Sequence, residues 1–447
     1  YAKEWVFQYM DWIKKNPLLV VSREERATLN DEQKKILENV RFAWRPLEAS
    51  HRLQDQTNQF AYFITSKYFT PEFLTEFLVN YHKHAEHIMG NYSEKGNHLL
   101  FEAQRMLMAG AFFPEFKNAE KWRKSGIDIL NDEIIVQVYD DGFQFELDPH
   151  YHLAAINIFY KAIQIADANG FRNEFPKSYL DTVEKMIMAV VNYLHPNFQN
   201  PMFSDAKLDT KDQMIKNFKN WQQAFPDNPY IEFIASDRQK GKEPPYLSHM
   251  LPTSGFYFFR NSWKEDATFM VLKAGPPAFW HNQPDNGTFE LSLRGKNFFP
   301  DAGSYVYGGD SEVLKERNWF RQTMVHKTLT MDNKDIETTD SKCLLWNIDN
   351  KKQQVLTTEN QGYSDLKHRR TVFFVDEEFF VIVDEAIGTG KGNVGVHYQL
   401  SEGEMELDPA KMTLKSLYKD GNNVFIQGFG SQSITMTEEE GWVSYAY

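Results

Sequence analysis

The spacing of apolar residues changes at one polar stretch, Arg238–Pro245, which contains Gly241 and two prolines. Before this stretch, apolar residues recur at intervals of three and four, as expected of helices with one buried face. After it, short apolar runs alternate with turn residues, which is typical of β-strands. We therefore expect a multidomain α+β protein, with a helical domain over residues 1–240 and an antiparallel β domain over residues 241–447.

The helical signals are clearest where capping residues precede an apolar pattern. Thr70, Pro71 and Glu72 have the order of an N-cap, a proline at the first helical position and an acid in the first turn. The periodic segments are separated by short loops such as 91–96 and 169–170. Loops of this length predict antiparallel helical hairpins.

The second half carries the signals of paired strands. The apolar runs 371–375 and 379–383 flank Asp376–Glu378, which is the pattern of a β-hairpin. Repeated short strands of this kind predict a β-sandwich. The final run, 442–447, has a similar composition, so we expect a strand there as well and a trimmed C-terminus.

Composition excludes several classes of protein. Of 447 residues, 42% are hydrophobic and 25% are charged, which fits a globular protein with more than one domain. The net charge of −13 argues against a general nucleic-acid binder, and no apolar run reaches the ~20 residues of a membrane span. We expect neither nucleic acid nor membrane as a partner. The single Cys343 excludes an internal disulfide and a cysteine-based zinc site.

The stretch 279–290 is the strongest candidate for chemistry. It places Trp280 and His281 beside two amides and two acids around a Pro/Gly turn. A histidine next to tryptophan and amide groups suits sugar chemistry, and loops of this composition often carry function. Trp280 is a candidate platform on which a sugar ring stacks. Further along, Asp301 and His326 adjoin strand-like runs, so they and Gln283 are candidates to hold a divalent ion.

Four other polar positions have two interpretations each. Asn97 either caps a helix or takes part in catalysis, and Tyr151 either packs as a buried aromatic or transfers protons. The histidines around His84 either line a solvated helix face or bind a metal. The run Lys367–Arg370 either protects an edge strand or binds anions. The residues alone leave these alternatives open.

The motifs together resemble those of the heparinase II/III polysaccharide lyases, and within them polysaccharide lyase family 12. The resemblance covers nearly the whole chain. It implies an incomplete (α/α) toroid of helical hairpins followed by an antiparallel β-sandwich domain. The motifs that carry it are Trp44–Glu48, Gly96–His98, Asp141–His152, His281–Phe289, Asp301–Ser304 and His326–Leu329.

The resemblance also assigns site residues. It implies that Asn97, Tyr151 and His281 are catalytic. It places a structural divalent metal ion (calcium, zinc or manganese), and no organic cofactor, on Gln283, Asp301 and His326. Heparinase II has a histidine at the position of Gln283, so the chain departs from that branch.

The implied activity is β-elimination at C4–C5 of a uronic acid in heparan sulfate, a glycosaminoglycan. Alternatives are another uronate polymer (alginate, hyaluronan or chondroitin) and a non-catalytic glycan-binding protein. We expect Arg45, Arg52, His152 and Trp280 to contact the substrate, and a neighbouring cation, His152 or an arginine, to lower the pKa of the Tyr151 phenol. We also expect a monomeric, periplasmic protein whose signal peptide and first helices precede Tyr1.

Overall fold

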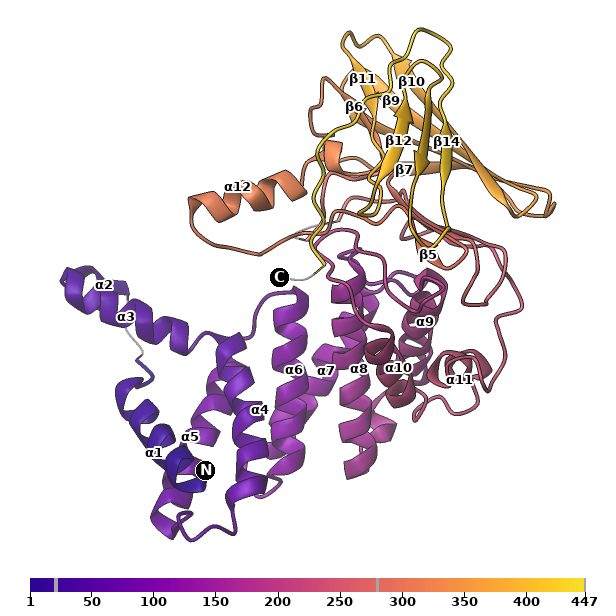
Figure 1. Cartoon of the computed structure of the whole chain (residues 1–447). Helices are drawn as coiled ribbons and strands as arrows, with labels where there is room; N and C mark the ends of the chain where they lie inside the picture. Colours follow the sequence, from indigo (N-terminus) through magenta and orange to yellow (C-terminus); the bar gives the residue numbers. More distant parts are fainter. Residues whose placement is uncertain (20–22, 279–280, 446–447) are drawn as a thin grey trace. The chain divides into compact units, whose positions relative to one another are not determined.

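The computed structural model describes residues 1–19, 23–278 and 281–445 (Figure 1). The chain forms two compact units, described separately here. The first comprises residues 1–137 and 155–181, and the second comprises residues 138–154 and 182–447. The domain boundary at residues 240 and 241 stays a prediction.

The first unit is helical. Its helices are α1 (Ala2–Lys15), α2 (Arg23–Thr28), α3 (Asp31–Ala43), α4 (Pro46–Phe63), α5 (Pro71–Gly90), α6 (Gly96–Phe112) and α7 (Ala119–Gln137), with parts of α8 (Pro149–Asn169) and α9 (Lys177–Tyr193). Helix α6 packs against α4 and α7, and α4 packs against α5. A Cβ on Gly110 or Gly126 would collide with the backbone of the facing helix, so these glycines permit the close approach of α6 and α7.

Capping and aromatic packing explain much of this unit. Helix α5 begins as expected, because the side chain of Thr70 accepts a hydrogen bond from the N–H of Phe73. Aromatic side chains dominate the core, including Tyr9, Phe77 and Trp122. Aromatic rings of this size bury much apolar area and stabilise the helical pairs against each other.

The second unit contains all the sheets among the described residues. A five-stranded sheet has the order β1 (His249–Leu251), β2 (Phe256–Arg260), β3 (Phe269–Lys273), β4 (Phe289–Leu293), β5 (Lys296–Asn297). A four-stranded sheet has the order β10 (Phe379–Gly388), β9 (Leu366–Val375), β8 (Gln353–Tyr363), β7 (Ser341–Asn347). Smaller sheets pair β11 (Val394–Val396) with β6 (Leu329–Met331), and β12 (Met405–Asp408), β13 (Thr413–Ser416) and β14 (Phe425–Gln427). The paired strands run antiparallel.

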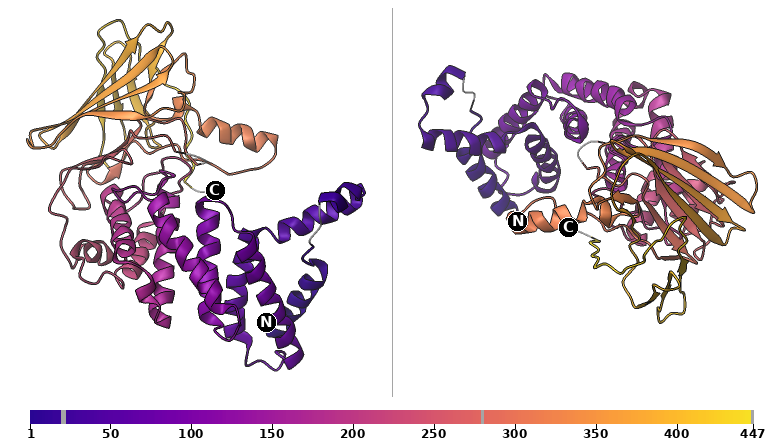
Figure 2. Two further views of the ribbon diagram at one scale, coloured as in Figure 1. Left: turned by 180° about the vertical axis from the view of Figure 1, so that it is seen from behind. Right: turned by 90° about the horizontal axis from the view of Figure 1, so that it is seen from above.

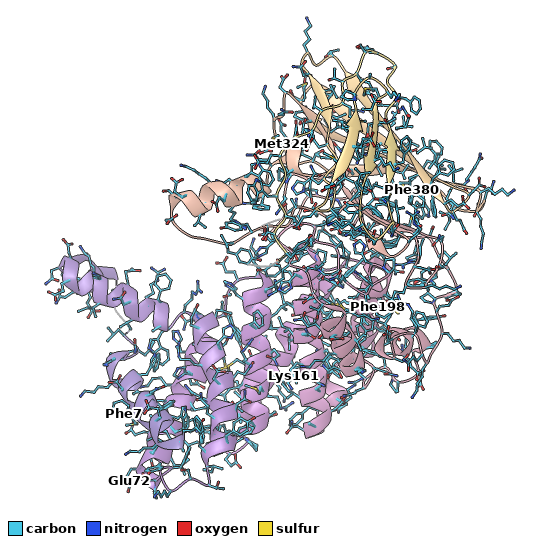
Figure 3. All side chains as sticks on the ribbon, in the orientation of Figure 1. Phe7, Glu72, Lys161, Phe198, Met324 and Phe380 are labelled. Carbon is cyan, nitrogen blue, oxygen red and sulfur yellow. The ribbon has the colours of Figure 1, made fainter. Side chains whose placement is uncertain are left out.

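The two larger sheets, whose ribbons are drawn in two further views in Figure 2, share one apolar core, as a β-sandwich requires. Phe259 and Leu272 from the first sheet pack in the same cluster as Val372 and Phe374 from the second. Phe380, labelled in Figure 3, stacks on Phe374 with ring centroids 4.5 Å apart. The predicted hairpin is confirmed, because β9 and β10 pair from Val375 and Phe379 outward.

Helices also belong to this unit. They are α10 (Lys211–Trp221), α11 (Pro229–Ala235) and α12 (Ser311–Phe320). The segment between α9 and α10 is fixed to the five-stranded sheet, since Arg260 donates a hydrogen bond to the carbonyl of Leu194 and Glu290 accepts one from the N–H of Met202. This attachment positions residues 203–205 beside the sheet.

Two expectations for this half are wrong. Residues 442–445 form no strand. The run Lys367–Arg370 lies on the inner strand β9, not at an edge, and its alternate side chains His368 and Arg370 are buried. A buried arginine is tolerated there because Asp384 on the neighbouring strand β10 binds it.

Among the described residues, no helix has the length and apolar character needed to cross a bilayer. Cys343 lies on β7 with an exposed side chain.

Candidate active site

Tyr151 stands in the first turn of α8, where its backbone is held by a cap. The carboxylate of Asp148 accepts hydrogen bonds from the N–H groups of His150 and Tyr151, at 2.7 and 3.0 Å. Such a cap fixes the start of a helix and therefore the direction of the side chains in its first turn. The phenol of Tyr151 is half-buried and donates a hydrogen bond to the hydroxyl of Tyr307, at 2.8 Å.

His281 lies flat against Tyr151. The two rings have centroids 3.8 Å apart and planes 14° apart. Tyr307 meets the same imidazole edge-on, at 5.6 Å between centroids. The structure thus brings together two of the three residues assigned to catalysis, and it adds a second tyrosine to the pair.

Asp205 orients the imidazole of His281. Its Oδ2 atom lies 3.0 Å from Nδ1 of His281, and both carboxylate oxygens bind the guanidinium of Arg317 on α12, at 3.1 and 3.0 Å. Asp205 is buried, whereas the side chain of His281 is 23% exposed. A carboxylate that holds one imidazole nitrogen leaves the other nitrogen directed away from it and available for chemistry.

Two further carboxylates surround His281. Nε2 of His281 lies 3.7 Å from Oε2 of Glu146. Burial raises the pKa of Glu146 to about 7 and that of Asp148 to about 6. Burial opposes the charge on His281, but the hydrogen bond with Asp205 and the fields of Glu146 and Asp148 outweigh it and raise the pKa of His281. The site therefore favours the imidazolium.

The imidazolium of His281 stacks on the ring of Tyr151, but the phenol nevertheless has a raised pKa. Burial raises its pKa, and the hydrogen bond to Tyr307 only partly opposes this rise. His152, expected to supply charge or contact substrate, is fully buried, and burial lowers its pKa to about 4. Its Nδ1 accepts the N–H of Gln144 and its Nε2 lies 2.9 Å from the carbonyl of Met186. These contacts are structural, so the function proposed below does not use His152.

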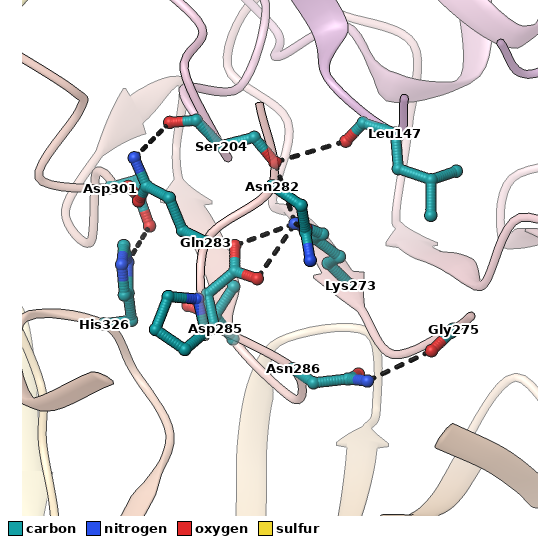
Figure 4. Close-up of polar contacts among 12 residues, drawn as sticks. Leu147, Ser204, Lys273, Gly275, Asn282, Gln283, Asp285, Asn286, Asp301 and His326 are labelled. Atoms are coloured by element: carbon teal, nitrogen blue, oxygen red, sulfur yellow. Dashed lines mark hydrogen bonds and ion pairs between the residues drawn. The ribbon is translucent and has the colours of Figure 1, made fainter. Parts of the chain in front are cut away.

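The predicted metal ligands come from three segments, and only Gln283 belongs to the loop of His281. Nδ1 of His326 is 3.0 Å from Oδ2 of Asp301, and the amide of Gln283 donates to the carbonyl of Ser204 at 2.7 Å (Figure 4). Within the described part of the chain, Oε1 of Gln283 and Nε2 of His326 are buried without a hydrogen-bond partner. Buried polar atoms normally have partners, so these two orphaned acceptors fit a bound cation.

The same region also limits which cation fits. No group of three or more His, Cys, Asp and Glu side chains among the described residues is arranged for a metal, because the third donor here is an amide. The ammonium of Lys327 lies 3.8 Å from the Asp301 carboxylate and offsets part of its charge. A donor set that includes imidazole suits zinc or manganese better than calcium, which prefers oxygen ligands.

Asn97 belongs to the first unit and occupies the first turn of α6. The N-cap of α6 is Lys95, and the preceding loop is fixed because Glu102 accepts the N–H and hydroxyl of Ser93, both at 2.7 Å. Asn97 therefore does not cap this helix, and the capping interpretation is wrong. Its half-buried side chain stays the predicted catalytic amide.

The two arginines predicted to contact the substrate already bind other groups of the protein. Arg45 occupies the N-cap position of α4, but its side chain makes no capping hydrogen bond. Its guanidinium binds both carboxylate oxygens of Glu48 instead. Arg52 lies 4.4 Å from the ring centroid of Trp12 and donates to Nε2 of His84, and burial lowers its pKa to about 10. Their contacts with substrate stay predictions, and Trp280 lies outside the described residues.

His84 lies on no solvated helix face, and both of its ring nitrogens are occupied by protein partners. His84 is fully buried, and its Nδ1 bonds to the carbonyl of Asn80 at 2.7 Å. Its other nitrogen faces Arg52. Both interpretations are therefore wrong for His84, whereas His82 of the same helix has a side chain that is 43% exposed.

Family models account for nearly the whole chain. Residues 1–233 match the model "Heparinase II/III N-terminus" and residues 243–447 match "Heparinase II/III-like, C-terminal". The chain belongs to the heparinase II/III family.

Individual members of the heparinase II/III family are similar over the full chain. A heparin-sulfate lyase of Bacteroides stercoris is 60% identical, with 100% of this chain and 67% of the relative covered. A heparin-sulfate lyase of Pedobacter heparinus is 46% identical, with 100% and 66% covered. The chain thus spans about two thirds of the length of these curated relatives.

Solved structures of heparinase III confirm the fold class. One matches with a TM-score of 0.90 at 60% identity, covering 100% of this chain and 70% of that chain. The heparan sulfate lyase of Pedobacter heparinus matches with a TM-score of 0.81 at 46% identity, covering 100% and 68%. The expected toroid portion followed by an antiparallel β-sandwich is confirmed.

Several residues around His281 were not found from the sequence. Asp205 lies in the segment between α9 and α10, which carries no recognisable motif. Tyr307 lies in the loop before α12, and Arg317 lies on α12 itself. This helix was not predicted, because the surrounding sequence is rich in strand signals. Glu146 and Asp148 lay inside a quoted motif, where the apolar neighbours Phe145 and Leu147 of Glu146 were a signal of a raised pKa.

Proposed function

We propose that the chain is a heparan-sulfate lyase that cleaves its glycosaminoglycan substrate by β-elimination at C4–C5 of a uronic acid. The observation that carries this proposal is the stacked pair of Tyr151 and His281, with Asp205 behind the imidazole. The pair supplies a phenol and an oriented imidazole in a chain 60% identical to a heparin-sulfate lyase. Glycan binding alone requires no such pair.

The first task in this reaction is to reduce the charge on the uronate carboxylate. The C5 proton is weakly acidic because the adjacent carboxylate is negative, so a hydrogen-bond donor there favours the enolate-like intermediate. Asn97 supplies a neutral amide donor. The imidazolium of His281, favoured by its raised pKa, supplies a charged donor for the same carboxylate.

The second task is proton transfer, and we assign it to Tyr151. In glucuronate the C5 proton and the O4 leaving group lie on one side, so the phenolate of Tyr151 takes the C5 proton and the resulting phenol protonates O4 as the C4–O4 bond breaks. Positioned acid–base groups typically accelerate a reaction by roughly 10²- to 10⁴-fold. Tyr151 first loses its own proton to water, and the hydrogen bond to Tyr307 opposes part of the rise in its pKa.

The proposal includes a structural divalent ion on Gln283, Asp301 and His326. When bound, the ion supplies charge neutralisation and bracing rather than a reacting group. Gln283 is two residues from His281, so holding its amide also restrains the loop that carries the imidazole. The orphaned acceptors of Gln283 and His326 support this assignment.

An assay with several uronate polymers tests the function. Purified protein is incubated with heparan sulfate, heparin, chondroitin, hyaluronan or alginate, and the ultraviolet absorbance of unsaturated uronate is followed. We expect product from heparan sulfate, and a loss of at least about 10²-fold in Tyr151→Phe without a change in unfolding temperature. Tyr62→Phe is the matched control, because Tyr62 is a tyrosine of α4 with an exposed side chain.

Two results would overturn the assignment. A folded wild-type protein that yields unsaturated product from none of the polymers is not a lyase. Turnover at the wild-type rate in Tyr151→Phe removes Tyr151 from the mechanism while leaving the function in place.

Metal removal tests the ion separately. We expect about one equivalent of zinc or manganese in the purified protein, and a lower unfolding temperature after treatment with a chelator. Gln283→Ala should lose the metal and become insensitive to the chelator. Equal metal content in this variant and the wild type would exclude Gln283 as a ligand. The absence of an organic cofactor, the monomeric state and the periplasmic location stay predictions.

A further inference from the structure

One buried ammonium group binds several parts of the site at once. Nζ of Lys273, at the end of β3, lies 2.9 Å from Oγ of Ser204, 2.8 Å from Oδ1 of Asn282 and 2.9 Å from both carboxylate oxygens of Asp285 (Figure 4). Lys273 is 4% exposed and Asp285 is 1% exposed. An ammonium has three N–H donors, so these three partners satisfy it completely.

The backbone of Lys273 holds the other end of the same loop. Its N–H donates to the carbonyl of Thr288 at 2.9 Å, and its carbonyl accepts the N–H of Gly287 at 2.8 Å. The side chain therefore fixes the beginning of the loop at Asn282, while the backbone fixes the end. Removing the side chain would release the beginning and leave the strand pairing intact.

The partners of the ammonium are neighbours of the residues that do the chemistry. Asn282 follows His281 in the chain, and Ser204 precedes Asp205. Ser204 adopts a left-handed backbone with φ of 65°, which is uncommon for a residue with a side chain and requires support from its surroundings. The contacts of its hydroxyl with Lys273 and of its carbonyl with Gln283 supply that support.

We propose that Lys273, together with Ser204, Asn282 and Asp285, is a positioning device for the His281–Asp205 pair; these four residues are termed the lysine clamp. The lysine clamp touches neither substrate nor reacting atoms. It sets the separation of the two segments that carry the imidazole and the carboxylate. This inference rests on the proposed role of His281, and it adds the residue that holds His281 in place.

We infer that the ammonium of Lys273 serves to position the loop of His281 rather than to stabilise the fold. A buried ion pair contributes little net stability compared with apolar side chains of the same size. The geometry explains its presence, because only an ammonium donates in three directions and links three separate segments. A misplacement of a catalytic group by about 1 Å is sufficient to lower turnover by about 100-fold.

The test uses Lys273→Met, which has a similar length but no charge. Because this variant leaves Asp285 buried and unpaired, a second variant, Lys273→Met with Asp285→Asn, removes both charges and protects the fold. We expect kcat for heparan sulfate to fall by about 10- to 100-fold in both, with little change in KM. Lys273→Arg retains a cation, and the adjoining cavity of about 170 Å³ gives it room, so its kcat should lie nearer the wild type.

Lys296→Met is the matched control. Lys296 pairs with Asp420 at 2.9 Å in the same unit, outside the loop of His281. We expect its kcat and KM to equal those of the wild type. A loss of unfolding temperature with unchanged kcat in the Lys273 variants would show that the clamp is only structural and would overturn the inference.

A second measurement does not depend on turnover. The rate at which diethyl pyrocarbonate modifies His281, followed by peptide mass spectrometry, should rise by about 3- to 10-fold when the imidazole is released from Asp205. An unchanged rate in both Lys273 variants overturns the clamp even if the wild type is inactive. If the wild type has no lyase activity but His281 is modified faster in the Lys273 variants, the proposed function is overturned and the lysine clamp is supported.

Discussion

His281 and His368 each bond to an aspartate that an arginine also holds. Asp205 and Arg317 surround the first, and Asp384 and Arg370 surround the second. The two histidines nevertheless differ in their affinity for a proton. The pKa of His281 is raised, whereas burial lowers the pKa of His368 despite its hydrogen bond to Asp384.

The difference comes from the wider surroundings. The side chain of His281 is 23% exposed, and its Nε2 atom lies 3.7 Å from the carboxylate of Glu146. Asp148 adds further negative charge. His368 is 4% exposed, and the nearby guanidinium of Arg370 repels its charged form. Histidine, aspartate and arginine therefore form a site that favours the protonated imidazole in the loop of His281. On strand β9 the same three residue types favour the neutral imidazole of His368. The partners within about 6 Å of the ring, rather than the aspartate alone, decide the outcome.

Substituting each histidine in turn is the strongest test of this contrast. We expect His281→Asn to lower lyase turnover by roughly 10²- to 10⁴-fold with little change in stability. His368→Asn should keep the turnover of the folded protein but lose roughly 1–3 kcal/mol of unfolding free energy, because a buried hydrogen bond to Asp384 is disturbed. Turnover and urea unfolding measured on both variants check this. Equal losses of turnover in the two variants would contradict the contrast.

Replacing Glu146, the carboxylate near Nε2 of His281, should have a smaller effect than replacing either histidine, and the effect should appear in the pH dependence of stability. Burial raises the pKa of Glu146 from 4.5 to about 7, so the folded protein binds its proton more tightly than the unfolded chain. This contribution to stability is full below the unfolded pKa and is lost as pH rises through the folded pKa. Glu146→Gln should therefore match the wild type near about pH 4.5 and exceed it by roughly 1–3 kcal/mol near about pH 8.

Urea unfolding across this pH range is the measurement. Glu359→Gln is the control, because Glu359 is paired with Lys367 and Arg369 at the surface and its pKa is lowered instead. The control should therefore not gain stability as pH rises. Parallel stability curves for Glu146→Gln and the wild type would show that Glu146 does not carry a raised pKa.

The sequence was sufficient where local pattern decides structure. The apolar runs and the turn Asp376–Glu378 predicted β9 and β10, and the motif order placed His281 and Tyr151 in one family's arrangement. The position of this turn also predicts which residues of the two strands pair. Counting outward from Val375 and Phe379 pairs Arg370 with Asp384, which would have shown that this arginine has a buried partner.

Other parts depended on contacts between residues distant in the chain. Asp205 is 76 residues from His281, and no periodicity connects them. The expected acidification of Tyr151 by His152 failed for a similar reason. Consecutive residues of a helix point in directions about 100° apart, so Tyr151 meets His281 while His152 is directed into the core. Sequence proximity was a poor guide to electrostatic proximity here.

Gly287 connects the two histidine environments. It has a left-handed φ of 93°, and its carbonyl accepts a hydrogen bond from Arg370 at 2.7 Å. A Cβ at this position would lie 3.2 Å from Oγ1 of Thr328 and 3.5 Å from the ring of His368. Any side chain at residue 287 would therefore strain the backbone and press on both Thr328 and His368, so this position of the loop tolerates little variation.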